Sequence, residues 1–426
     1  MRLRREVETR TGIRHDRRRP TLKTFAGAIA FAFAAAGTAV PAGAYTYKVL
    51  HDFTPDTFPT GYELFIDASG TLYGGAAGGV YSLTPNADRS KWTRKLVYPV
   101  DATGIIGDTA GNLYGTSLEG GAHNGGFVFE LTPNADRSQW TLTTLVDFSF
   151  QSQPRSNVTY AGAQSGALYD GVSPLYGTTT QGGAGGFGVV FALTPDGGNW
   201  DYAVLHDFCP RKDSCRDGAR PWGDVLADPA GNLFGTTLGG GYDFNGVLYE
   251  LSPGSGGGAW TETILHRFCR KKSCADGASP TGSLVMDTAG ALLGTTHTTG
   301  HCPKRYVYCG AAFALLPAGT KSPLTVLYSF CSLGHCDDGN GPDQLTLDAA
   351  GNLFGTTDLG GTKGHGTVFE LSGTSEQVLH NFCQKKDCAD GGTPVGRPAE
   401  DSLGNLYGTT QRGGKKGGGV LYELSP

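Results

Sequence analysis

The chain has 426 residues, and 68 of them are glycine, about 16% against a typical share of roughly 7%. Aromatic residues make up 10% of the chain and the net charge is only −5, which excludes a disordered polymer. A single hydrophobic core stops growing at roughly 250–300 residues. The length therefore excludes one ordinary core and indicates either two domains or a repetitive architecture with many small cores.

The first 44 residues indicate an export signal. Nine basic residues lie between positions 2 and 23, and an alanine-rich apolar run from Phe25 to Val40 follows them. Ala42-Gly43-Ala44 then provides a cleavage site of the A-x-A type. We expect residues 1–44 to be a signal peptide, although a membrane helix is the alternative and both bacterial export routes stay open. The mature protein would begin near Tyr45.

Export fits the charge and the apolar pattern of the remaining chain. Residues 45–426 carry 25 basic and 36 acidic side chains, a net charge of −11, which argues against nucleic acid as a partner. No second apolar stretch is long enough to span a bilayer. We therefore expect no transmembrane segment after signal removal, and a periplasmic or secreted location in a bacterium.

A ten-residue unit, Asp-x-x-Gly-Asn-Leu-Tyr-Gly-Thr-Thr, dominates the mature chain. Its leucine recurs seven times at a mean spacing of about 56 residues, at Leu72, Leu113, Leu175, Leu233, Leu292, Leu353 and Leu406. The Asp and the Gly suit the first and fourth positions of a type I turn, so we interpret this Asp as a turn former and not as a ligand.

Each repeat contains four short segments with strand composition and no helical periodicity. They are an apolar segment before the Asp, the Leu-Tyr-Gly-Thr-Thr segment, a Val-Phe-Glu-Leu segment, and a segment that ends in Leu-x-x-Phe. Four strands repeated seven times indicate a β-propeller. A parallel β-helix usually has shorter repeats, and a β-sandwich would not repeat one unit seven times. We predict an all-β, single-domain, seven-bladed β-propeller with four-stranded antiparallel blades over residues 45–426.

The cysteines form five close pairs after residue 208. Their even number, short spacing and exported context predict local disulfides, which would staple loops and not the whole fold. Zinc ligation is the alternative, but the pairs recur at intervals of roughly 60 residues and do not cluster in the sequence. The predicted pairs are Cys209/Cys215, Cys269/Cys274, Cys302/Cys309, Cys331/Cys336 and Cys383/Cys388.

The repeat, with its Gly-Gly pair and the following Gly-x-Val-Phe-Glu-Leu-x-Pro segment, resembles the GloVer tandem-repeat family of exported bacterial proteins over residues 45–426. The resemblance implies a bacterial repeat propeller but brings no established activity or catalytic residue. Members of that family often end in a sorting anchor, whereas this chain stops at its last strand, which favours a soluble or differently retained form.

The Asp-x-x-Gly-Asn-Leu-Tyr run is also similar to the turn in NHL and related propellers, where it joins the innermost strand of a blade to the second. This similarity implies that the chain starts with an outer strand, residues 45–53, and ends with a third strand, residues 419–424. The N-terminal outer strand would then pair with the C-terminal strands and close the seventh blade. Such closure removes exposed sheet edges, and we expect a monomer.

Two sets of loops would share one face of this propeller. The loops that hold four of the cysteine pairs, and the Gly-Gly loops, are rich in basic residues. We hypothesise a basic face that binds an anionic or polar glycan of the cell envelope, with solvated, functionless loops as the alternative. The candidate residues are Lys212, Lys271, Lys272, Lys304, Arg305, Lys385, Lys386, Lys415 and Lys416.

A second candidate site is the axial channel. Four residues before the repeat Asp the inner strand would enter the channel, and there the repeats differ, with Glu63, Gly104, Asp224, Ser283, Gln344 and Arg397. Glu63, Asp224, Gln344 and Arg397 are our candidates for binding at the channel mouth. Charge variation around a water-filled channel is the alternative interpretation.

No motif for a cofactor or for nucleophilic catalysis occurs in the sequence, and we predict no cofactor, no metal and no catalytic residue. His51, His206, His266 and His380 occupy one repeat position and are interpreted as structural. We therefore expect a binding or scaffold protein with an unidentified envelope ligand. The alternative is a propeller enzyme, a glycan or lactone hydrolase or lyase, with its site at the channel mouth.

Overall fold

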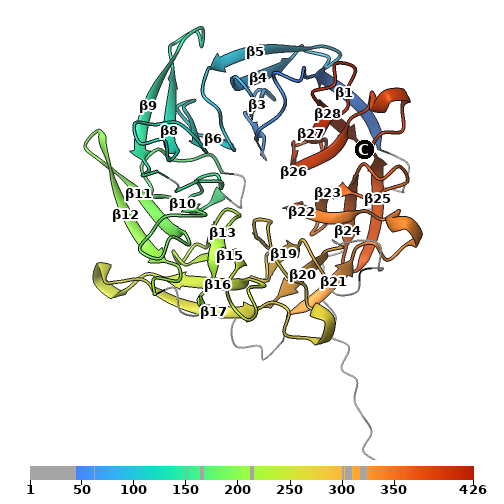
Figure 1. The fold of residues 1–426 in the computed structure, drawn as a ribbon. Helices are drawn as coiled ribbons and strands as arrows, with labels where there is room; N and C mark the ends of the chain where they lie inside the picture. Colours follow the sequence, from blue (N-terminus) through green and yellow to red (C-terminus); the bar gives the residue numbers. More distant parts are fainter. Residues whose placement is uncertain are drawn as a thin grey trace, which may run out of the picture. The chain divides into compact units, whose positions relative to one another are not determined.

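The computed structural model describes residues 45–61, 63–150, 152–163, 167–211, 215–299, 302, 309–316 and 324–426. In these ranges seven antiparallel sheets stand around a central axis, so the protein is a seven-bladed β-propeller, as predicted (Figure 1). The expected signal peptide, residues 1–44, lies outside the described residues. The described ranges contain no α-helix, only short 3-10 helices at η2 (Ser255–Gly257), η3 (Lys272–Cys274), η4 (Gly334–Cys336) and η5 (Lys386–Cys388).

Blades one to three follow each other along the first half of the chain. Blade one contains β2 (Phe65–Ile66), β3 (Leu72–Ala76), β4 (Gly79–Pro85) and β5 (Trp92–Tyr98). Blade two contains β6 (Ile105–Gly107), β7 (Leu113–Ser117), β8 (Phe127–Pro133) and β9 (Trp140–Asp147). Blade three contains β10 (Leu175–Thr179), β11 (Val189–Asp196) and β12 (Asn199–Asp207).

Blades four to six complete most of the ring. Blade four contains β13 (Ala219–Pro221), β14 (Leu226–Ala227), β15 (Leu233–Gly239), β16 (Val247–Ser252) and β17 (Thr261–Arg267). Blade five contains β18 (Val285–Met286), β19 (Leu292–Thr296), β20 (Ala311–Leu315) and β21 (Thr325–Ser329). Blade six contains β22 (Asn340–Leu347), β23 (Leu353–Leu359), β24 (Thr367–Ser372) and β25 (Ser375–Asn381).

Both ends of the described chain meet in blade seven. It contains β26 (Gly392–Glu400), β27 (Leu406–Arg412), β28 (Val420–Ser425) and, as its outermost strand, β1 (Thr46–Asp52). The N-terminal strand runs antiparallel to the last strand, with Thr46 opposite Ser425 and Asp52 opposite Val420. This pairing confirms the predicted closure of the ring by an outer strand from the N-terminus.

The inner strand departs from the repeat in two blades. In blade four it is split into β13 and β14, which both pair with β15. In blade three it is reduced to an isolated antiparallel bridge between Thr159 and Tyr176. The segment that follows this bridge replaces the usual short turn, and its Tyr169 is fully buried between blades two and three. The insertion therefore contributes to the core.

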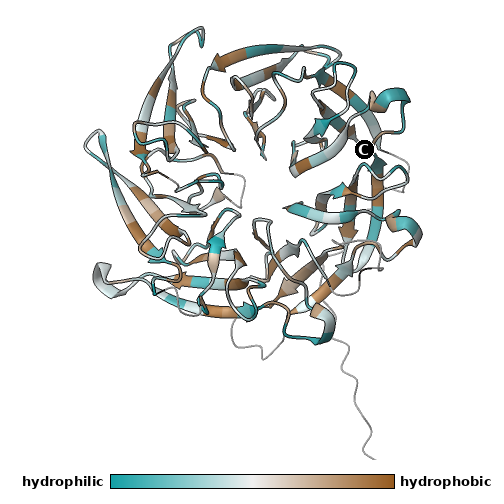
Figure 2. Cartoon of the chain, viewed as in Figure 1, coloured by the Kyte–Doolittle hydropathy of each residue, from teal (hydrophilic) through white to brown (hydrophobic). Residues whose placement is uncertain are grey.

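The core lies between neighbouring blades, where apolar side chains of adjacent sheets interlock. Tyr249 of blade four, for example, packs in one cluster with Val190 and Phe208 of blade three. Gly235 lies opposite Tyr249 in the neighbouring strand, and a methyl group added to Gly235 would come 2.3 Å from the Tyr249 hydroxyl oxygen. In blades two to seven the corresponding glycine thus leaves room for the aromatic ring of the following strand. Figure 2 shows the resulting alternation of hydrophobic and hydrophilic positions along the strands.

The repeat Asp forms the predicted turn between the inner strand and the next. In blade four the carbonyl oxygen of Asp228 accepts a hydrogen bond from the Gly231 amide at 3.1 Å. The carboxylate of Asp228 accepts two more, from the backbone amide and the side-chain amide of Asn232, at 2.8 and 2.9 Å. The acceptors of this Asp are therefore used in the turn, which confirms its structural role.

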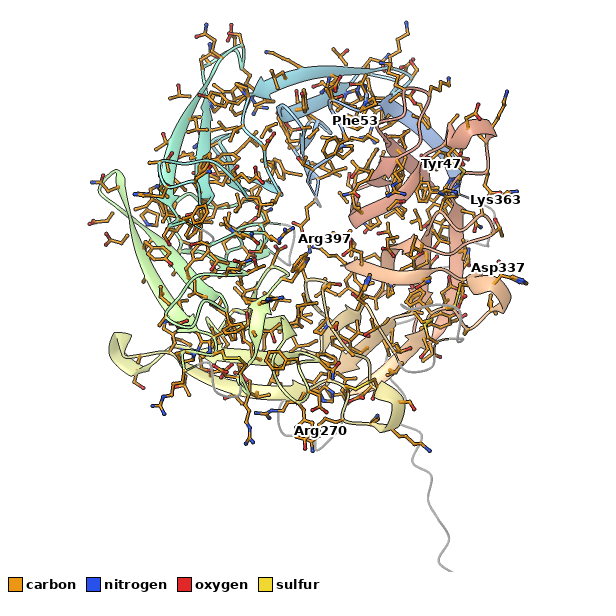
Figure 3. The ribbon with its side chains drawn as sticks, viewed as in Figure 1. Tyr47, Phe53, Arg270, Asp337, Lys363 and Arg397 are labelled. Carbon is orange, nitrogen blue, oxygen red and sulfur yellow. A yellow bond between two sulfur atoms is a disulfide. The ribbon has the colours of Figure 1, made fainter. Side chains whose placement is uncertain are left out.

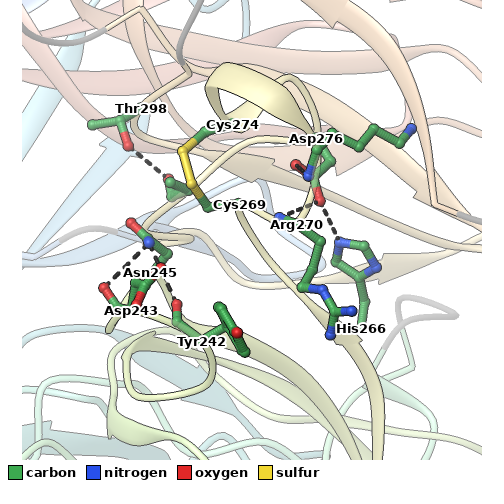
Figure 4. Close-up of a disulfide and its surroundings, with 11 residues drawn as sticks. Tyr242, Asp243, Asn245, His266, Cys269, Arg270, Cys274, Asp276 and Thr298 are labelled. Carbon is green, nitrogen blue, oxygen red and sulfur yellow. Dashed lines mark hydrogen bonds and ion pairs between the residues drawn. A yellow bond between two sulfur atoms is a disulfide. The ribbon is translucent and has the colours of Figure 1, made fainter.

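All five predicted disulfides are present. They join Cys209 to Cys215, Cys269 to Cys274, Cys302 to Cys309, Cys331 to Cys336 and Cys383 to Cys388. Four of them staple the loops that lead from an outer strand to the next blade, and Figure 4 shows the example of blade four. In these four loops an Asp follows the second cysteine by two residues and accepts hydrogen bonds from loop amides, as Asp276 does from Arg270 and Lys271. This Asp is a part of the loop motif that the cysteine pattern alone does not predict.

The disulfides that staple the loops are also partly buried, which the spacing of the cysteines does not predict. Cys215 is 3% exposed and packs with Ala219, which begins the inner strand of blade four. Cys309 is 1% exposed and packs against the disulfide between Cys331 and Cys336. The physical reason is that a disulfide is apolar and is stabilised by burial like any small hydrophobic group. These disulfides therefore extend the interior of the propeller into two small clusters beneath the loops.

Candidate functional site

The inner strands place one variable side chain of each blade at the axis. The six positions named from the sequence are joined by a seventh, Asn157, because the Thr159–Tyr176 bridge corresponds to the pairing of Leu226 with Phe234 in blade four. The ring of seven positions, which we call the axial ring, consists of Glu63, Gly104, Asn157, Asp224, Ser283, Gln344 and Arg397. In Figure 3, Arg397 lies near the centre of the propeller.

Five members of the axial ring form one polar network, in which the Ser283 hydroxyl accepts a hydrogen bond of 2.9 Å from the Asp224 amide. Arg397 Nη2 lies 3.1 Å from Glu63 Oε2, and the same oxygen accepts a hydrogen bond of 3.5 Å from the Asn157 side-chain amide. The Asn157 backbone amide donates to Asp224 Oδ1 at 2.6 Å. Burial and the neighbouring Glu63 carboxylate raise the pKa of Asp224 well above its ordinary value, whereas Arg397 acts in the opposite direction. Two acidic groups therefore share a single cation at the axis.

The axial ring separates two cavities. One, of about 320 Å³, opens on the face that carries the disulfide loops and the Gly-Gly loops. The other, of about 600 Å³, lies on the side of the Asp turns. Glu63, Asn157 and Asp224 line both cavities, so they stand at the constriction between them. Gln344 lines the first cavity and Arg397 the second.

The first cavity, here called the channel mouth, contains further acidic groups that the sequence analysis missed. Burial raises the pKa of Asp343, and burial together with Asp343 raises the pKa of Asp358 to about 7. His297, in the same lining, has a pKa lowered by burial and is therefore a neutral imidazole at neutral pH. A methyl group on Gly341 would come 2.3 Å from Asp358 Oδ1 and 3.1 Å from His297 Cε1, so Gly341 keeps the space between these two groups open.

Three acceptor atoms around the channel mouth have no hydrogen-bond partner among the described residues. They are Glu63 Oε1, Gln344 Oε1 and Asp358 Oδ1, and each is shielded from solvent. Glu63 and Gln344 are 7% and 8% exposed, which makes an unsatisfied oxygen costly unless something donates to it. The mouth thus presents a convergent set of acceptors to any molecule that enters it.

One wall of the channel mouth is aromatic and cationic. The guanidinium carbon of Arg155 lies 4.6 Å from the centre of the Trp222 ring, a cation–π contact. Both residues line the cavity, and the Arg155 Nε atom has no hydrogen-bond partner among the described residues. The lining therefore combines a flat aromatic surface, a cationic donor and several acceptors, which is the usual composition of a small-molecule site.

Of the four candidates for the channel mouth, Glu63, Asp224 and Gln344 line the cavity, and Arg397 contacts Glu63 from the other side. Two sequence signals identify the residues that were missed. A proline precedes the axial ring position by three residues in Pro154-Arg155-Ser156-Asn157, as in Pro221-Trp222-Gly223-Asp224. The residue after each Thr-Thr pair is also variable, and in blades five to seven it is His297, Asp358 and Gln411, all of which line the mouth.

The basic candidates lie on the disulfide and Gly-Gly loops. Lys271, Lys272, Lys385, Lys386, Lys415 and Lys416 are all exposed. In Figure 3, Arg270 and Asp337 of two disulfide loops, and Lys363 of a Gly-Gly loop, lie at the outer margin of the disc. Lys212, Lys304 and Arg305 lie outside the described residues. Among the described residues, the structure therefore brings the acidic candidates together at the axis and distributes the basic candidates around the rim.

The sequence matches the Gloeobacter/Verrucomicrobia repeat family over residues 75–308 and 261–426. The chain therefore belongs to this family. No match was found among curated proteins. In the part of the chain that the structure describes, no helix is long and apolar enough to cross a membrane.

Three solved structures illustrate the distant likenesses of the fold. A carbohydrate-active enzyme of family AA12 from Trichoderma reesei is 14% identical, with a TM-score of 0.45 over 91% of this chain and 97% of that one. The PQQ-bound aldose sugar dehydrogenase of Streptomyces coelicolor is 13% identical, with a TM-score of 0.42 over 79% and 98%. The calcium-binding protein regucalcin of Agrobacterium tumefaciens is 12% identical, with a TM-score of 0.42 over 79% and 96%.

Proposed function

We propose that this member of the Gloeobacter/Verrucomicrobia repeat family is an exported binding protein of the bacterial envelope whose channel mouth takes a neutral, polyhydroxylated ligand such as a short glycan. The observation that carries this proposal is the convergence of three unsatisfied acceptors, Glu63 Oε1, Gln344 Oε1 and Asp358 Oδ1, on one cavity. Hydroxyl groups are the donors that such acceptors require. A cavity of about 320 Å³ is at the lower end of the range for small-ligand sites.

The charges at the channel mouth favour a neutral ligand over an anionic one. Glu63, Asp224, Asp343 and Asp358 give the lining an acidic character that only Arg155 and the nearby Arg397 offset. An anionic glycan would meet like charges there. We therefore expect an anionic ligand only at the exposed lysines of the disulfide and Gly-Gly loops, here called the basic rim. It would bind there weakly and with a strong dependence on salt.

Export is supported by the five disulfides of the chain. Disulfides form and persist in oxidising compartments and are rare in the cytosol. Together with the signal-like segment 1–44 they support a periplasmic or secreted location.

The experiment that tests the ligand class is a glycan array on the mature protein, residues 45–426, followed by calorimetry on the hits. We expect a neutral oligosaccharide to bind equally well at low and high salt. Gln344→Leu should weaken this binding about tenfold or more, because it removes one acceptor at nearly constant volume. The double variant Lys385→Ala/Lys386→Ala is the matched control at the rim and should leave the affinity unchanged.

Binding of acidic polysaccharides alone, lost at high salt and in the rim variant, would overturn the proposal in favour of the basic rim. Product analysis of every hit distinguishes a binding protein from the alternative, a hydrolase or lyase. One observation supports this alternative. Glu63 and Asp224 form a carboxyl pair at the base of the channel mouth, and the pKa of Asp224 in this pair is raised. Cleavage that is abolished in Asp224→Asn would assign the mouth to catalysis.

A further inference from the structure

The outer strands of neighbouring blades meet at a repeated joint. In three of these joints, the side chain that follows the Leu of Leu-x-x-Phe on one blade contacts a residue of the next outer strand. This residue lies six positions before the Phe of that strand, and the contacts are His206 with Glu262, Tyr328 with Glu376, and His380 with Tyr47. In blades three to six, the Asp of the disulfide loop lies beside the first of these side chains. The joint between blades three and four contains His206 of β12, Asp217 of the disulfide loop and Glu262 of β17.

These three side chains direct their polar atoms toward one point. His206 Nε2 lies 3.6 Å from Glu262 Oε1 and 3.9 Å from Asp217 Oδ2, and one ligand atom of each residue lies within 4.8 Å of the others. The side chains of His206, Glu262 and Asp217 are 19%, 15% and 26% exposed, respectively, so the group is largely enclosed yet reachable from solvent. Asp217 is held in place by the Cys209 amide, which donates to its Oδ2 atom at 2.9 Å.

Both separations from His206 are too long for hydrogen bonds, and the separation from Glu262 suits a shared ion. A hydrogen bond requires about 2.7–3.2 Å between nitrogen and oxygen. Ligands placed about 2.0–2.2 Å from a tetrahedral zinc ion are roughly 3.3–3.6 Å apart. The 3.6 Å between His206 and Glu262 matches this range, and the 3.9 Å between His206 and Asp217 is slightly longer. His206 Nε2 and Glu262 Oε1 are both shielded from solvent and have no hydrogen-bond partner among the described residues. Two facing atoms that both offer a lone pair, with no proton donor paired to either, are what a missing cation would leave.

The other joints provide internal comparisons. In Figure 4, His266 and Asp276 of blade four form a direct contact of 3.1 Å, and Leu324 occupies the position that corresponds to Glu262. His380 stacks on Tyr47 at 3.8 Å between ring centres. In blade five a tyrosine, Tyr328, replaces the histidine and donates to Asp338. Among these joints, only the one between blades three and four combines an imidazole with two carboxylates.

A second metal-like group in the described residues, His365 with Cys383 and Cys388, does not compete with this assignment. The two sulfur atoms are bonded to each other in a disulfide and are not thiolates.

We propose that His206, Asp217 and Glu262 bind a divalent transition-metal ion that links blades three and four. Imidazole favours zinc and its first-row neighbours, and three protein ligands leave a fourth position to water. Calcium and magnesium are less suited, because they prefer more oxygen ligands and no imidazole. The proposal is independent of the channel mouth, since its residues lie on two outer strands and a disulfide loop, and the ligand-binding proposal uses none of them.

The test uses the mature protein stripped with a chelator and titrated with Zn²⁺ by calorimetry. We expect one ion per chain, a rise in the thermal midpoint on addition of Zn²⁺, and no comparable effect of Ca²⁺. Glu262→Gln should weaken Zn²⁺ binding at least about tenfold. Glu376→Gln, which changes the corresponding glutamate of blade six, is the matched control and should bind Zn²⁺ like the unaltered protein.

A second measurement needs no variant and therefore stands even where Glu262→Gln fails to fold. Diethylpyrocarbonate modifies accessible imidazoles, and peptide mass spectrometry identifies the modified histidine. Saturating Zn²⁺ should lower the modification of His206 several-fold and leave that of His266 unchanged. Equal modification of His206 with and without Zn²⁺, or Zn²⁺ affinity that is the same in Glu262→Gln as in Glu376→Gln, would overturn the proposal.

Discussion

Individual side chains at the blade joints and at the axis have pKa values that their surroundings shift away from the ordinary values. Burial and Asp338 raise the pKa of Glu376 to about 7, although Tyr328 acts in the opposite direction through a hydrogen bond. Its Oε1 atom has no partner among the described residues. A carboxylate whose folded-state pKa is raised lowers the stability of the fold when it ionises.

The sign of this effect gives a pH-dependent prediction. Stability associated with Glu376 is fully present below its ordinary pKa near 4.5 and is lost as the pH rises through about 7. Glu376→Gln removes the ionisation, and it should raise the free energy of unfolding by about 1–2 kcal/mol at pH 8. At pH 4 the two proteins should be equally stable. Urea denaturation at both pH values checks this, and a stabilisation at pH 4 as large as at pH 8 would show that ionisation is not the cause.

The axial ring predicts an asymmetry between its two acidic residues. Glu63 holds Arg397 directly, at 3.1 Å, whereas Asp224 accepts a backbone hydrogen bond that asparagine could accept equally. Glu63→Gln should therefore cost about 1–3 kcal/mol at pH 7, because it leaves the guanidinium without a carboxylate in direct contact. Asp224→Asn should be neutral or slightly stabilising. Chemical denaturation of both variants measures the difference, and an equal loss in both would contradict the assigned roles.

At the scale of the element, the unit of organisation is the pairing of the second and third strands in each blade. The aromatic side chain lies sixteen residues after the repeat Leu in five of the seven blades because it must reach the space beside the glycine of the neighbouring strand. In blade four, Tyr249 is fully buried, and its hydroxyl oxygen occupies the volume next to Gly235. The glycine and the aromatic therefore form one packing unit.

This packing unit predicts the effect of a single methyl group. Gly235→Ala should destabilise the protein by about 2–4 kcal/mol, because the Tyr249 ring cannot move aside in a close-packed core. Gly334→Ala is the matched control, since nothing lies within 4 Å of the added methyl group and its backbone is not left-handed. Thermal unfolding of the two variants compares them, and a Gly235→Ala protein as stable as Gly334→Ala would mean that the blade absorbs the methyl group by a shift.

At the scale of the whole molecule, the sequence predicts the parts of the fold that depend on local repetition. Turns and disulfides follow from motifs in which the interacting residues are close in sequence, whereas strand order and closure were implied by the similarity to NHL propellers. Asn157 was not identified from the sequence, because the other ring positions were found by their spacing from the repeat Asp. In blade three the insertion that contains Tyr169 interrupts this spacing. The irregular inner strand of blade three therefore prevented the prediction of one member of the axial ring.

Burial of the disulfides shows the same limit. The spacing of six residues between Cys209 and Cys215 predicts their bond, because the two partners are close in the sequence. The contact of Cys309 with the disulfide between Cys331 and Cys336 depends instead on two separate loops that meet only in the folded blade. The pairing of two cysteines can therefore be predicted from the sequence of one loop, whereas the residues that pack against the disulfide cannot.

The composition of the channel mouth depends on contacts between blades that no repeat encodes. His297 and Asp358 follow the Thr-Thr pairs of two different blades, and their proximity across Gly341 results from the curvature of the ring. Patterns within one repeat identify variable positions, but which of these positions converge is a property of the closed molecule.

Closure itself gives the last prediction. Strand β1 contributes to the cores on both sides of blade seven, since Tyr47 and Val49 pack in the cluster with Phe382 and Leu50 packs in the cluster with Tyr81. A chain that begins at Thr54 should therefore lose both contacts and expose the edge of β28, with a loss of most of its stability and a tendency to associate. A chain that begins at Tyr45 is the control and should unfold cooperatively.

The decisive measurement is rescue in trans. A synthetic peptide of residues 45–53 should bind the truncated chain by adding the missing strand to β28 and restore cooperative unfolding in proportion to its concentration. The same peptide with serine in place of Tyr47 and Val49 keeps the backbone donors and acceptors but lacks the two buried side chains, so it should not rescue. Rescue by both peptides would mean that backbone pairing alone closes the ring, and cooperative unfolding of the truncated chain without peptide would mean that the other strands of blade seven suffice.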